Sequence, residues 1–576
     1  MSEDRINIDG IKKILWKYGQ TQLLKYFNDS SLTEEQRNSL LRQISIVDFE
    51  KLDSTFGDYQ TALQFDDVYS DLKPLEDKDV IGLESLPDEE QNMYEDLALE
   101  ELANERVALF LLAGGQGTRM KLNYNKGIYN IKLPSEKCLF QLHCERISHM
   151  EGLIYRKYHK VVHIPLFIMT SNMNNKQTKL FFEQHSYFGL LESQVQFFVQ
   201  GYLPCTDDQG KVLLYSKWQI TISPEGNGGF YGAIQKHHIL EQLKQRNIKH
   251  VYVAYVDNAT VQLPDPLFIG YCISQKVQLG VKCLPKTCPE EKLGIMLKKQ
   301  KTDESPDYHS EIPEGRLHIV EYNLFTYKNK CFRDHHCNLV YKYGYAGIMY
   351  FSADFLYQMV SNKLASVYHI ANKPVPYFDE LLGRTINPIY PNGYKCESFI
   401  FDAFTHAESY VCVNTRRYHF TPIKNLPGID CLVDSANQAR TRINQEHYQW
   451  LIRNQVNVIG ELQETWEDLC YCEISPLISR DGDSLSNLKQ ASLSLPLQII
   501  DKSELLFICK DIDIQHLFDS IQNPSEAYSE INRIEEDTDI QNNQRIQNYL
   551  QLCPPINEAY VTLPQLVKGF HIYIRL

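Results

Sequence analysis

The chain has no excess of basic residues, no long apolar run and no regular pairing of cysteines. Its 58 Lys and Arg are outnumbered by 73 Asp and Glu, which gives the 576 residues a net charge of −15. This balance argues against a general nucleic-acid binder, because affinity for a phosphate backbone needs clustered cations. A site for a smaller phosphate ligand must therefore be built locally, from backbone amides and a few placed cations.

No apolar run approaches the roughly 20 residues that a membrane helix needs, so we expect no membrane span. The polar start, Met1 to Arg5, leads into no apolar segment of the kind found in secretory signals. The 15 cysteines show neither a disulfide framework nor two zinc-binding pairs. Together these absences predict a cytoplasmic protein with reduced cysteines.

The apolar pattern changes at residue 107 and divides the chain into three parts. Residues 1–106 show helical spacing, including a capping box from Thr33 to Gln36, and are predicted to form an N-terminal helical region. Residues 426–576 are predicted to form a smaller C-terminal domain with a polar tail. The turn signal Leu426-Pro427-Gly428 marks its boundary.

Residues 107–425 are predicted to form the catalytic domain. Apolar runs such as Val107–Leu112 and Val251–Val256 are typical of strands buried on both faces of a parallel sheet. Helical patterns, including Cys138–Ile147 and Tyr231–Leu243, separate several of these runs. This alternation predicts an α/β fold with a doubly wound, Rossmann-like core.

The first apolar run ends in a glycine-rich loop, Gly114-Gly115-Gln116-Gly117-Thr118-Arg119. Open α/β sheets bind ligands at the carboxyl ends of their strands, and glycines let backbone N–H groups approach an anion closely. The loop lacks the Gly-Lys-Ser/Thr of a P-loop and the third glycine of a dinucleotide fingerprint. Taken alone, it is compatible with a phosphate site and with an ordinary tight turn.

Charged residues near this loop favour the phosphate site. Arg119 and Lys126 follow it closely and could neutralise a triphosphate, although a solvated surface pair is the simpler alternative. Asp257 directly follows the run Val251–Val256, where a carboxylate is a typical Mg²⁺ ligand or, alternatively, a turn or cap residue. The loop Gly226–Gly229 suits close approach to a base or a sugar and is equally compatible with an ordinary loop.

A series of short segments, spread over residues 100–480, points to one family. These segments are Leu112–Arg119, Lys126-Gly127, Ile168–Ser171, Tyr187–Leu190, Gln200-Gly201, Pro224–Gly229, Val256–Asn258, Asp265–Gly270, Val320–Tyr322, Pro391–Lys395, Pro422–Asn425 and Cys472–Ser479. Their order and content resemble the eukaryotic-type UDP-N-acetylglucosamine (UDP-N-acetylhexosamine) pyrophosphorylases. Each segment alone is unspecific, and the combination is highly specific. The resemblance implies a GT-A-like nucleotidyltransferase core.

The resemblance also implies two neighbouring binding sites. UTP would contact Leu112, Ala113, Gly114, Gly115, Lys126, Gln200, Gly226, Asp257 and Lys395, with Gln200 and Gly226 facing the uracil. The sugar phosphate would contact Asn227, Gly294, Glu321, Tyr322 and Lys424. The implied catalytic cations are Arg119, Lys126, Lys395 and Lys424, and Asp257 would hold Mg²⁺.

The expected activity is transfer of a uridylyl group from UTP to N-acetylglucosamine-1-phosphate, with pyrophosphate as the second product. Two alternatives stay open. One is the same reaction on another hexose-1-phosphate, such as glucose or galactose. The other is a protein that binds nucleotide sugars without turnover.

The chain departs from the family pattern at three places. Met120-Lys121 stands where Leu-Gly is usual, and Asn125 stands where Pro precedes the lysine, so we expect a change in how rigidly Lys126 is presented. Lys342 is expected at the first position of an Asn-Ala-Gly-Asn-like stretch that contacts the sugar. A lysine cannot reproduce the paired donor and acceptor of an amide, which makes sugar preference the open question.

Overall fold

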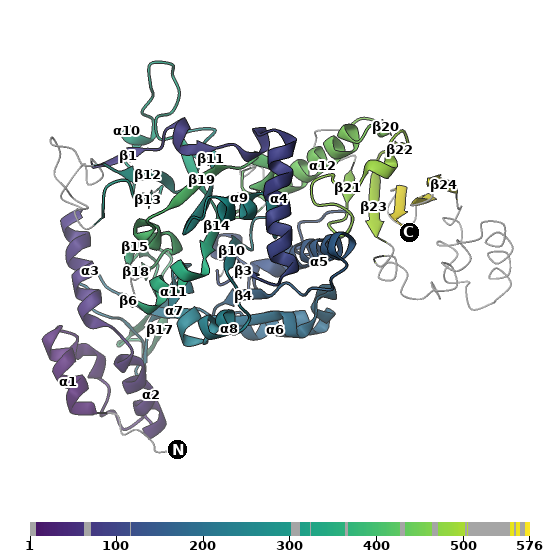
Figure 1. Cartoon of the computed structure of the whole chain (residues 1–576). Coiled ribbons are helices and arrows are strands. Elements are labelled where there is room, and N and C mark those ends of the chain that lie inside the picture. Colours follow the sequence, from purple (N-terminus) through teal and green to yellow (C-terminus); the bar gives the residue numbers. More distant parts are fainter. Residues whose placement is uncertain are drawn as a thin grey trace, which may run out of the picture.

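The computed structural model describes residues 7–62, 71–115, 117–300, 312–322, 324–362, 367–426, 433–462, 471–501, 504, 553–557, 560–564 and 571–575. The predicted boundary at Pro427-Gly428 and the acidic part of the tail lie outside these residues. Figure 1 shows the N-terminal helices at one end of the molecule and the C-terminal strands at the other.

A mixed sheet of 11 strands forms the centre of the molecule. Its main path runs β2 (Val80–Ile81), β19 (Tyr410–Asn414), β11 (Leu279–Pro285), β14 (Tyr343–Ser352), β10 (His250–Tyr255), β3 (Val107–Leu112), β4 (Leu166–Thr170) and β5 (Val195–Val199). The remaining strands are β1 (Leu72–Pro74), β12 (Ile295–Lys299) and β13 (Leu317–Val320). β10, β3, β4 and β5 run parallel, and β14 is antiparallel to both of its neighbours on the path.

Helices cover both faces of this sheet, because alternate side chains of each strand point to opposite sides. Phe110 of β3 packs against α7 (Gly229–Lys236) and α8 (Ile239–Gln245), with α11 (Ala353–Ser361) on the same face. Leu109 and Leu111 pack on the other face. The helices there are α4 (Asp88–Ala103), α5 (Leu139–Tyr158), α6 (Asn175–Gln184) and α9 (Pro266–Ser274). The doubly wound prediction is confirmed.

A second sheet of four strands flanks the central one, in the order β15 (His369–Lys373), β18 (Gly393–Glu397), β6 (Tyr202–Thr206) and β9 (Ile222–Pro224). The N-terminal helices α1 (Ile8–Lys17), α2 (Glu34–Ser45) and α3 (Phe49–Ala62) pack on this part of the molecule. Two hairpins lie nearby, β7 (Leu214–Ser216) with β8 (Gln219–Ile220) and β16 (Tyr377–Asp379) with β17 (Arg384–Ile386). The capping box at Thr33 and Gln36 is present at the start of α2.

The C-terminal part begins with α12 (Ala436–Arg453) and ends in a five-stranded sheet. That sheet runs β21 (Cys472–Ile474), β23 (Leu497–Asp501), β26 (His571–Arg575), β25 (Tyr560–Pro564) and β24 (Cys553–Asn557). A separate pair joins β20 (Asn457–Ile459) to β22 (Ser492–Ser494). The chain end thus pairs with residues near 500.

Two details differ from the sequence prediction. The segment before residue 107 is not helical throughout, because β1 and β2 join the central sheet. The helical pattern Tyr231–Leu243 is split into α7 and α8 by His238, whose φ is +53°. In the described part of the chain, no helix is both long and apolar enough to cross a membrane.

Candidate functional site

A cavity of about 630 Å³ opens at the carboxyl ends of β3 and β10. Fourteen of the fifteen predicted site residues line it, and the exception is Ala113. The fourteen are Leu112, Gly114, Gly115, Arg119, Lys126, Gln200, Gly226, Asn227, Asp257, Gly294, Glu321, Tyr322, Lys395 and Lys424. These residues come from positions more than 300 apart in the chain, so the fold brings together what the sequence only suggested.

The glycine loop leaves β3 and lies against Gln200. A Cβ on Gly114 would lie 2.4 Å from Gln200 Nε2, so a side chain at this position would displace the Gln200 amide. Gln200 Nε2 donates to the Gly114 carbonyl (3.2 Å), and the buried Oε1 has no hydrogen-bond partner among the described atoms. Ala113 is buried behind the loop, where its carbonyl accepts from Asn125 Nδ2 at 2.8 Å. The predicted contact of Ala113 with UTP stays a prediction, since Ala113 itself does not line the cavity.

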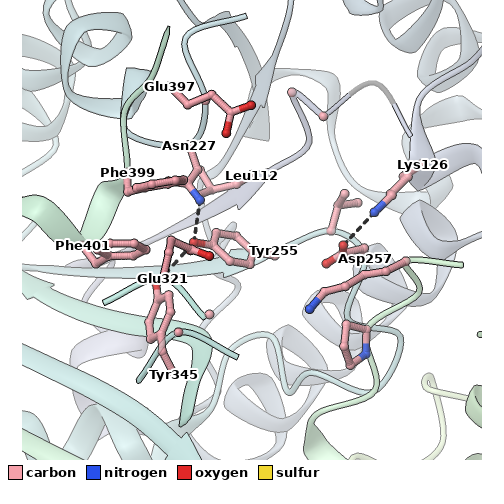
Figure 2. A pocket seen from close by; sticks show the side chains of 18 of the residues that line it. Leu112, Lys126, Asn227, Tyr255, Asp257, Glu321, Tyr345, Glu397, Phe399 and Phe401 are labelled. Atoms are coloured by element: carbon pink, nitrogen blue, oxygen red, sulfur yellow. Dashed lines mark hydrogen bonds and ion pairs between the residues drawn. The ribbon is translucent and has the colours of Figure 1, made fainter. Parts of the chain in front are cut away.

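Lys126 and Asp257 form an ion pair at the cavity wall, with 2.9 Å between Nζ and Oδ2, as Figure 2 shows. Burial alone would raise the pKa of Asp257, but Lys126 and Lys424 outweigh this effect and hold that pKa below its usual value. Asp257 therefore stays ionised at neutral pH. The pair places a fixed anion and a fixed cation at the carboxyl end of β10.

Asn125 fixes the segment that carries Lys126. It is fully buried, and its Oδ1 accepts from Gly127 N at 2.9 Å. Its Nδ2 donates to the Ala113 carbonyl and, at 3.2 Å, to Thr178 Oγ1. Asn125 thus holds by hydrogen bonds a segment that proline stiffens in the family pattern.

Lys424 reaches the cavity because its segment pairs with the residues around Asp257. Ile423 N donates to the Asp257 carbonyl (2.9 Å), and Asn258 forms an isolated bridge with Pro422. The Lys424 ammonium lies 3.8 Å from Asp434 Oδ2. These contacts bring a residue from the end of the predicted catalytic domain to the segment that follows β10 and carries Asp257.

Other cations surround the same space. Arg119 lines the cavity, with Nη2 3.5 Å from the Tyr322 hydroxyl, and Lys395 extends from β18. Lys292 and Lys373 also line the cavity, and neither was predicted from the sequence. Lys292 lies two residues before the predicted Gly294, and Lys373 lies on β15, which pairs with the strand of Lys395. Their position next to predicted residues, along the chain or on a paired strand, is the only feature that could have indicated them.

The far side of the cavity is aromatic and acidic. Phe399, Phe401, Tyr255 and Tyr345 line it together with Glu321. Burial raises the pKa of Glu321, and Lys424 offsets only part of that effect. None of the four aromatic residues was predicted, although Tyr255 lies two residues before Asp257. Figure 2 shows this side opposite the Lys126–Asp257 pair.

Lys342, which was expected at the sugar-contacting position of the family stretch, lies away from the site. Lys342 does not line the cavity, and its Nζ lies 2.5 Å from Asp77 Oδ1. Tyr345, Ala346 and Gly347 do line it, so the Ala-Gly of the family stretch matches Ala346-Gly347. Within this stretch, Tyr345 and not Lys342 therefore contributes a side chain to the cavity.

Lys121, which stands where the family pattern has glycine, has an unusual backbone conformation. Lys121 has a φ of +50°, a left-handed conformation that glycine adopts without the strain a Cβ brings. It is exposed and does not line the cavity. Lys121 therefore bears on the local strain of the loop and not on the composition of the site.

The donor set around Asp257 fits one mode of magnesium binding. No group of three or more His, Cys, Asp or Glu side chains that could hold a metal occurs among the described residues. Asp257 is an ionised carboxylate that uses Oδ2 for Lys126. Mg²⁺ commonly takes one or two carboxylates and completes its shell with phosphate oxygens and water. The site fits a metal that arrives with a nucleotide.

Comparison with known proteins agrees with this geometry. The profile of a family described as UTP--glucose-1-phosphate uridylyltransferase matches residues 56–447. A yeast (Saccharomyces cerevisiae) UDP-N-acetylglucosamine pyrophosphorylase is 31% identical, with 83% of this chain and 96% of that protein covered. A human UDP-N-acetylhexosamine pyrophosphorylase-like protein 1 is 32% identical, with 82% and 93% covered.

A solved structure shares the fold. The Trypanosoma brucei uridine diphosphate N-acetylglucosamine pyrophosphorylase aligns with a TM-score of 0.68 at 23% identity, over 84% of this chain and 95% of that one. The sequence relatives exceed 30% identity over more than four-fifths of the chain. The chain therefore belongs to the UTP--glucose-1-phosphate uridylyltransferase family, with the eukaryotic UDP-N-acetylhexosamine pyrophosphorylases.

Proposed function

We propose that this protein is a uridylyltransferase that makes UDP-N-acetylglucosamine and pyrophosphate from UTP and N-acetylglucosamine-1-phosphate. The observation that carries the proposal is the cavity itself. Several cations and one ionised carboxylate line one side of it, and aromatic and acidic side chains line the other. A nucleoside triphosphate fits the first side and a sugar fits the second.

The reaction is an in-line displacement at phosphorus. A phosphate oxygen of the sugar phosphate attacks the α-phosphorus of UTP, a new P–O bond forms, and the bond to the bridging oxygen breaks. Pyrophosphate leaves with that electron pair. A phosphate monoester is already a competent nucleophile, so the protein needs no general base and contributes positioning and charge stabilisation.

The cations have distinct proposed roles. Lys126 and Arg119 would neutralise charge on the triphosphate as the leaving group develops. Lys395 would hold the nucleotide phosphates, and Lys424 the incoming sugar phosphate. Lys424 is well placed for this role, because it lies near both Asp257 and Glu321.

Asp257 would hold Mg²⁺ through its carboxylate. When bound, the metal would neutralise phosphate charge and orient the triphosphate. Lys126 already bonds Asp257 Oδ2, so the same carboxylate would position the lysine and the metal. The uracil would lie near Gln200, whose buried and unpartnered Oε1 can accept from the N3–H group of the base.

A substrate panel tests the proposal. Pyrophosphate release would be measured with UTP, Mg²⁺ and the 1-phosphates of N-acetylglucosamine, N-acetylgalactosamine, glucose and galactose. We expect turnover with N-acetylglucosamine-1-phosphate above that with the plain hexoses. Higher activity with glucose-1-phosphate would favour the family's other described substrate. Binding of UDP-sugar in calorimetry without release from any sugar would favour the non-catalytic alternative.

The proposal includes the cellular compartment of the enzyme. In the described part of the chain, seven buried cysteines, Cys138, Cys144, Cys205, Cys272, Cys283, Cys396 and Cys412, are free thiols. Free thiols suit a reducing compartment, and we assign the protein to the cytoplasm. Subcellular fractionation with antibodies would test this, and enrichment with a secretory or organelle fraction would contradict it.

A further inference from the structure

The amide of Asn227 is held at both of its polar atoms by the protein. Its Oδ1 accepts from the Ile400 N–H group at 2.8 Å. Its Nδ2 donates to the Tyr255 hydroxyl at 3.0 Å, as Figure 2 shows. The Ile400 bond defines which way the amide faces, because a backbone N–H can only donate and exchanging O and N would put two donors in contact. One N–H of Asn227 stays available to a ligand in the cavity.

Tyr255 is itself held rigidly. Its hydroxyl lies 3.4 Å from that of Tyr345, and the two rings meet edge to face with centroids 6.3 Å apart. Tyr345 is 7% exposed and packs against Phe401 and Phe404, so it cannot move aside. Burial raises the pKa of Tyr255, which keeps the phenol protonated. Tyr255 can therefore accept from Asn227 while it donates to Tyr345.

Gly347 makes room for this arrangement. It has a φ of +71°, and a Cβ at this position would lie 2.5 Å from Cδ2 of the Tyr255 ring. The ring thus packs on a bare Cα of β14. Any larger residue at 347 would displace the Tyr255 ring and move its hydroxyl away from Asn227. The backbone of β14 therefore takes part in setting the position of the hydroxyl.

We propose that Tyr255 is a positioning residue that sets affinity for the sugar phosphate by holding the Asn227 amide. The proposal rests on the proposed function, in which Asn227 contacts the sugar phosphate. Tyr255 also lies two residues before Asp257 on the same chain segment. Its hydroxyl nevertheless points into the sugar side of the cavity, so removing the hydroxyl should affect the sugar phosphate and spare UTP.

The first test removes only the hydroxyl. Tyr255→Phe should raise the KM for N-acetylglucosamine-1-phosphate by about tenfold, as expected for loss of an orienting hydrogen bond. The KM for UTP and kcat should change by less than about twofold, because the lost interaction acts on ground state and transition state alike. Tyr345→Phe should have a smaller effect in the same direction, since Tyr345 contacts Asn227 only through Tyr255.

Tyr252 provides a matched control on the same strand. It is fully buried, its hydroxyl donates to the Gln262 carbonyl at 2.7 Å, and it does not line the cavity. Tyr252→Phe removes the same atom from β10 and should leave both KM values unchanged. If Tyr252→Phe raised the sugar KM as much as Tyr255→Phe, the effect would be a general loosening of β10 and the proposal would fail.

A double-mutant cycle separates positioning from direct contact. In an Asn227→Ala background, Tyr255→Phe should have no further effect on the sugar KM, because the residue that it positions is gone. A tenfold effect that persists there would mean that Tyr255 contacts the sugar itself, and would overturn the proposal. An equal rise in the KM values for UTP and sugar phosphate in the single variant would also overturn it.

Calorimetry keeps this test distinct from that of the proposed function. Absence of pyrophosphate release by the wild-type protein would contradict the proposed activity. In that case the Kd for N-acetylglucosamine-1-phosphate would be measured for the wild type, the two single variants and the double variant. A tenfold loss of affinity in Tyr255→Phe, with no further loss when Tyr255→Phe is added to Asn227→Ala, would support the positioning role. No detectable binding to the wild type, or no loss in Tyr255→Phe, would contradict it.

Discussion

The two sides of the cavity hold their side chains in place by different means. On the phosphate side, Lys126 and Asp257 form an ion pair, and backbone pairing around Asp257 positions Lys424. On the sugar side, Asn227 and Tyr255 are joined by neutral hydrogen bonds and aromatic packing. Figure 2 shows the two groups facing each other.

This difference separates the chemistry from the choice of substrate. Charges fixed at strand ends can stabilise a developing anion whichever sugar brings the nucleophile. Neutral hydrogen bonds in a shaped pocket discriminate between sugars, because a mismatched group leaves a buried partner unsatisfied. We therefore expect changes on the phosphate side to lower kcat and changes on the sugar side to raise one KM.

The largest effect is expected from Lys126→Ala. Removal of the ammonium that faces Asp257 should lower kcat on the order of 1000-fold, because it leaves triphosphate charge without a fixed partner. Pyrophosphate release and a thermal melt would be measured together. Lys121→Ala, five residues upstream at an exposed position outside the cavity, is the matched control and should keep near-normal turnover. Turnover near the wild-type rate in Lys126→Ala would refute the assignment.

Asp257→Asn should have the next largest effect. The amide keeps the size of the carboxylate but loses the charge that would hold Mg²⁺, so kcat/KM should fall on the order of 100-fold. The rate measured against Mg²⁺ concentration should shift to higher concentrations in the variant. An unchanged Mg²⁺ dependence would show that the metal is held elsewhere.

Glu321→Gln tests the sugar side. The variant should raise the sugar KM by about tenfold and leave the UTP KM unchanged, as expected for loss of a charged hydrogen-bond acceptor. Because the pKa of Glu321 is raised, the wild-type carboxylate gains a proton at a higher pH than a free glutamate does. The wild-type sugar KM should therefore rise as pH falls, and this rise should be absent in Glu321→Gln. An equal acid-side rise in both proteins would exclude Glu321 as its source.

Lys342→Asn should have the smallest effect. The Lys342 ammonium pairs with an exposed Asp77 outside the cavity, and surface ion pairs contribute little. Every KM should stay within about twofold of wild type, which is the change expected from loss of up to roughly 0.5 kcal/mol. A change in the ratio of turnover with N-acetylhexosamine phosphates to turnover with plain hexose phosphates would show that Lys342 does influence the choice of sugar.

The phosphate side could be predicted from sequence because its residues follow recognisable strands. The apolar run Val107–Leu112 ends in glycines, and Asp257 ends another such run, so the parallel sheet had to bring them to one edge. Local patterns were enough for these residues. The resemblance to a family then supplied the distant Lys395 and Lys424, which no local pattern connects to the loop.

The sugar side could not be predicted in the same way. Tyr255 and Tyr345 lie on adjacent antiparallel strands, and their facing positions depend on the register of β10 against β14. A tyrosine in an apolar strand looks like any core residue. Lys342 and Tyr345 lie only three positions apart, yet one pairs with Asp77 outside the cavity and the other lines it, a difference that the fold alone decides.

The most direct measurement of the central claim is the product balance of the wild-type protein with UTP, Mg²⁺ and N-acetylglucosamine-1-phosphate. Chromatography would quantify the UDP-sugar, and a phosphate-specific assay would quantify pyrophosphate. We expect the two products to appear in equal amounts and Lys126→Ala to form neither at a comparable rate. Pyrophosphate without UDP-sugar, or equal turnover by Lys126→Ala, would contradict it.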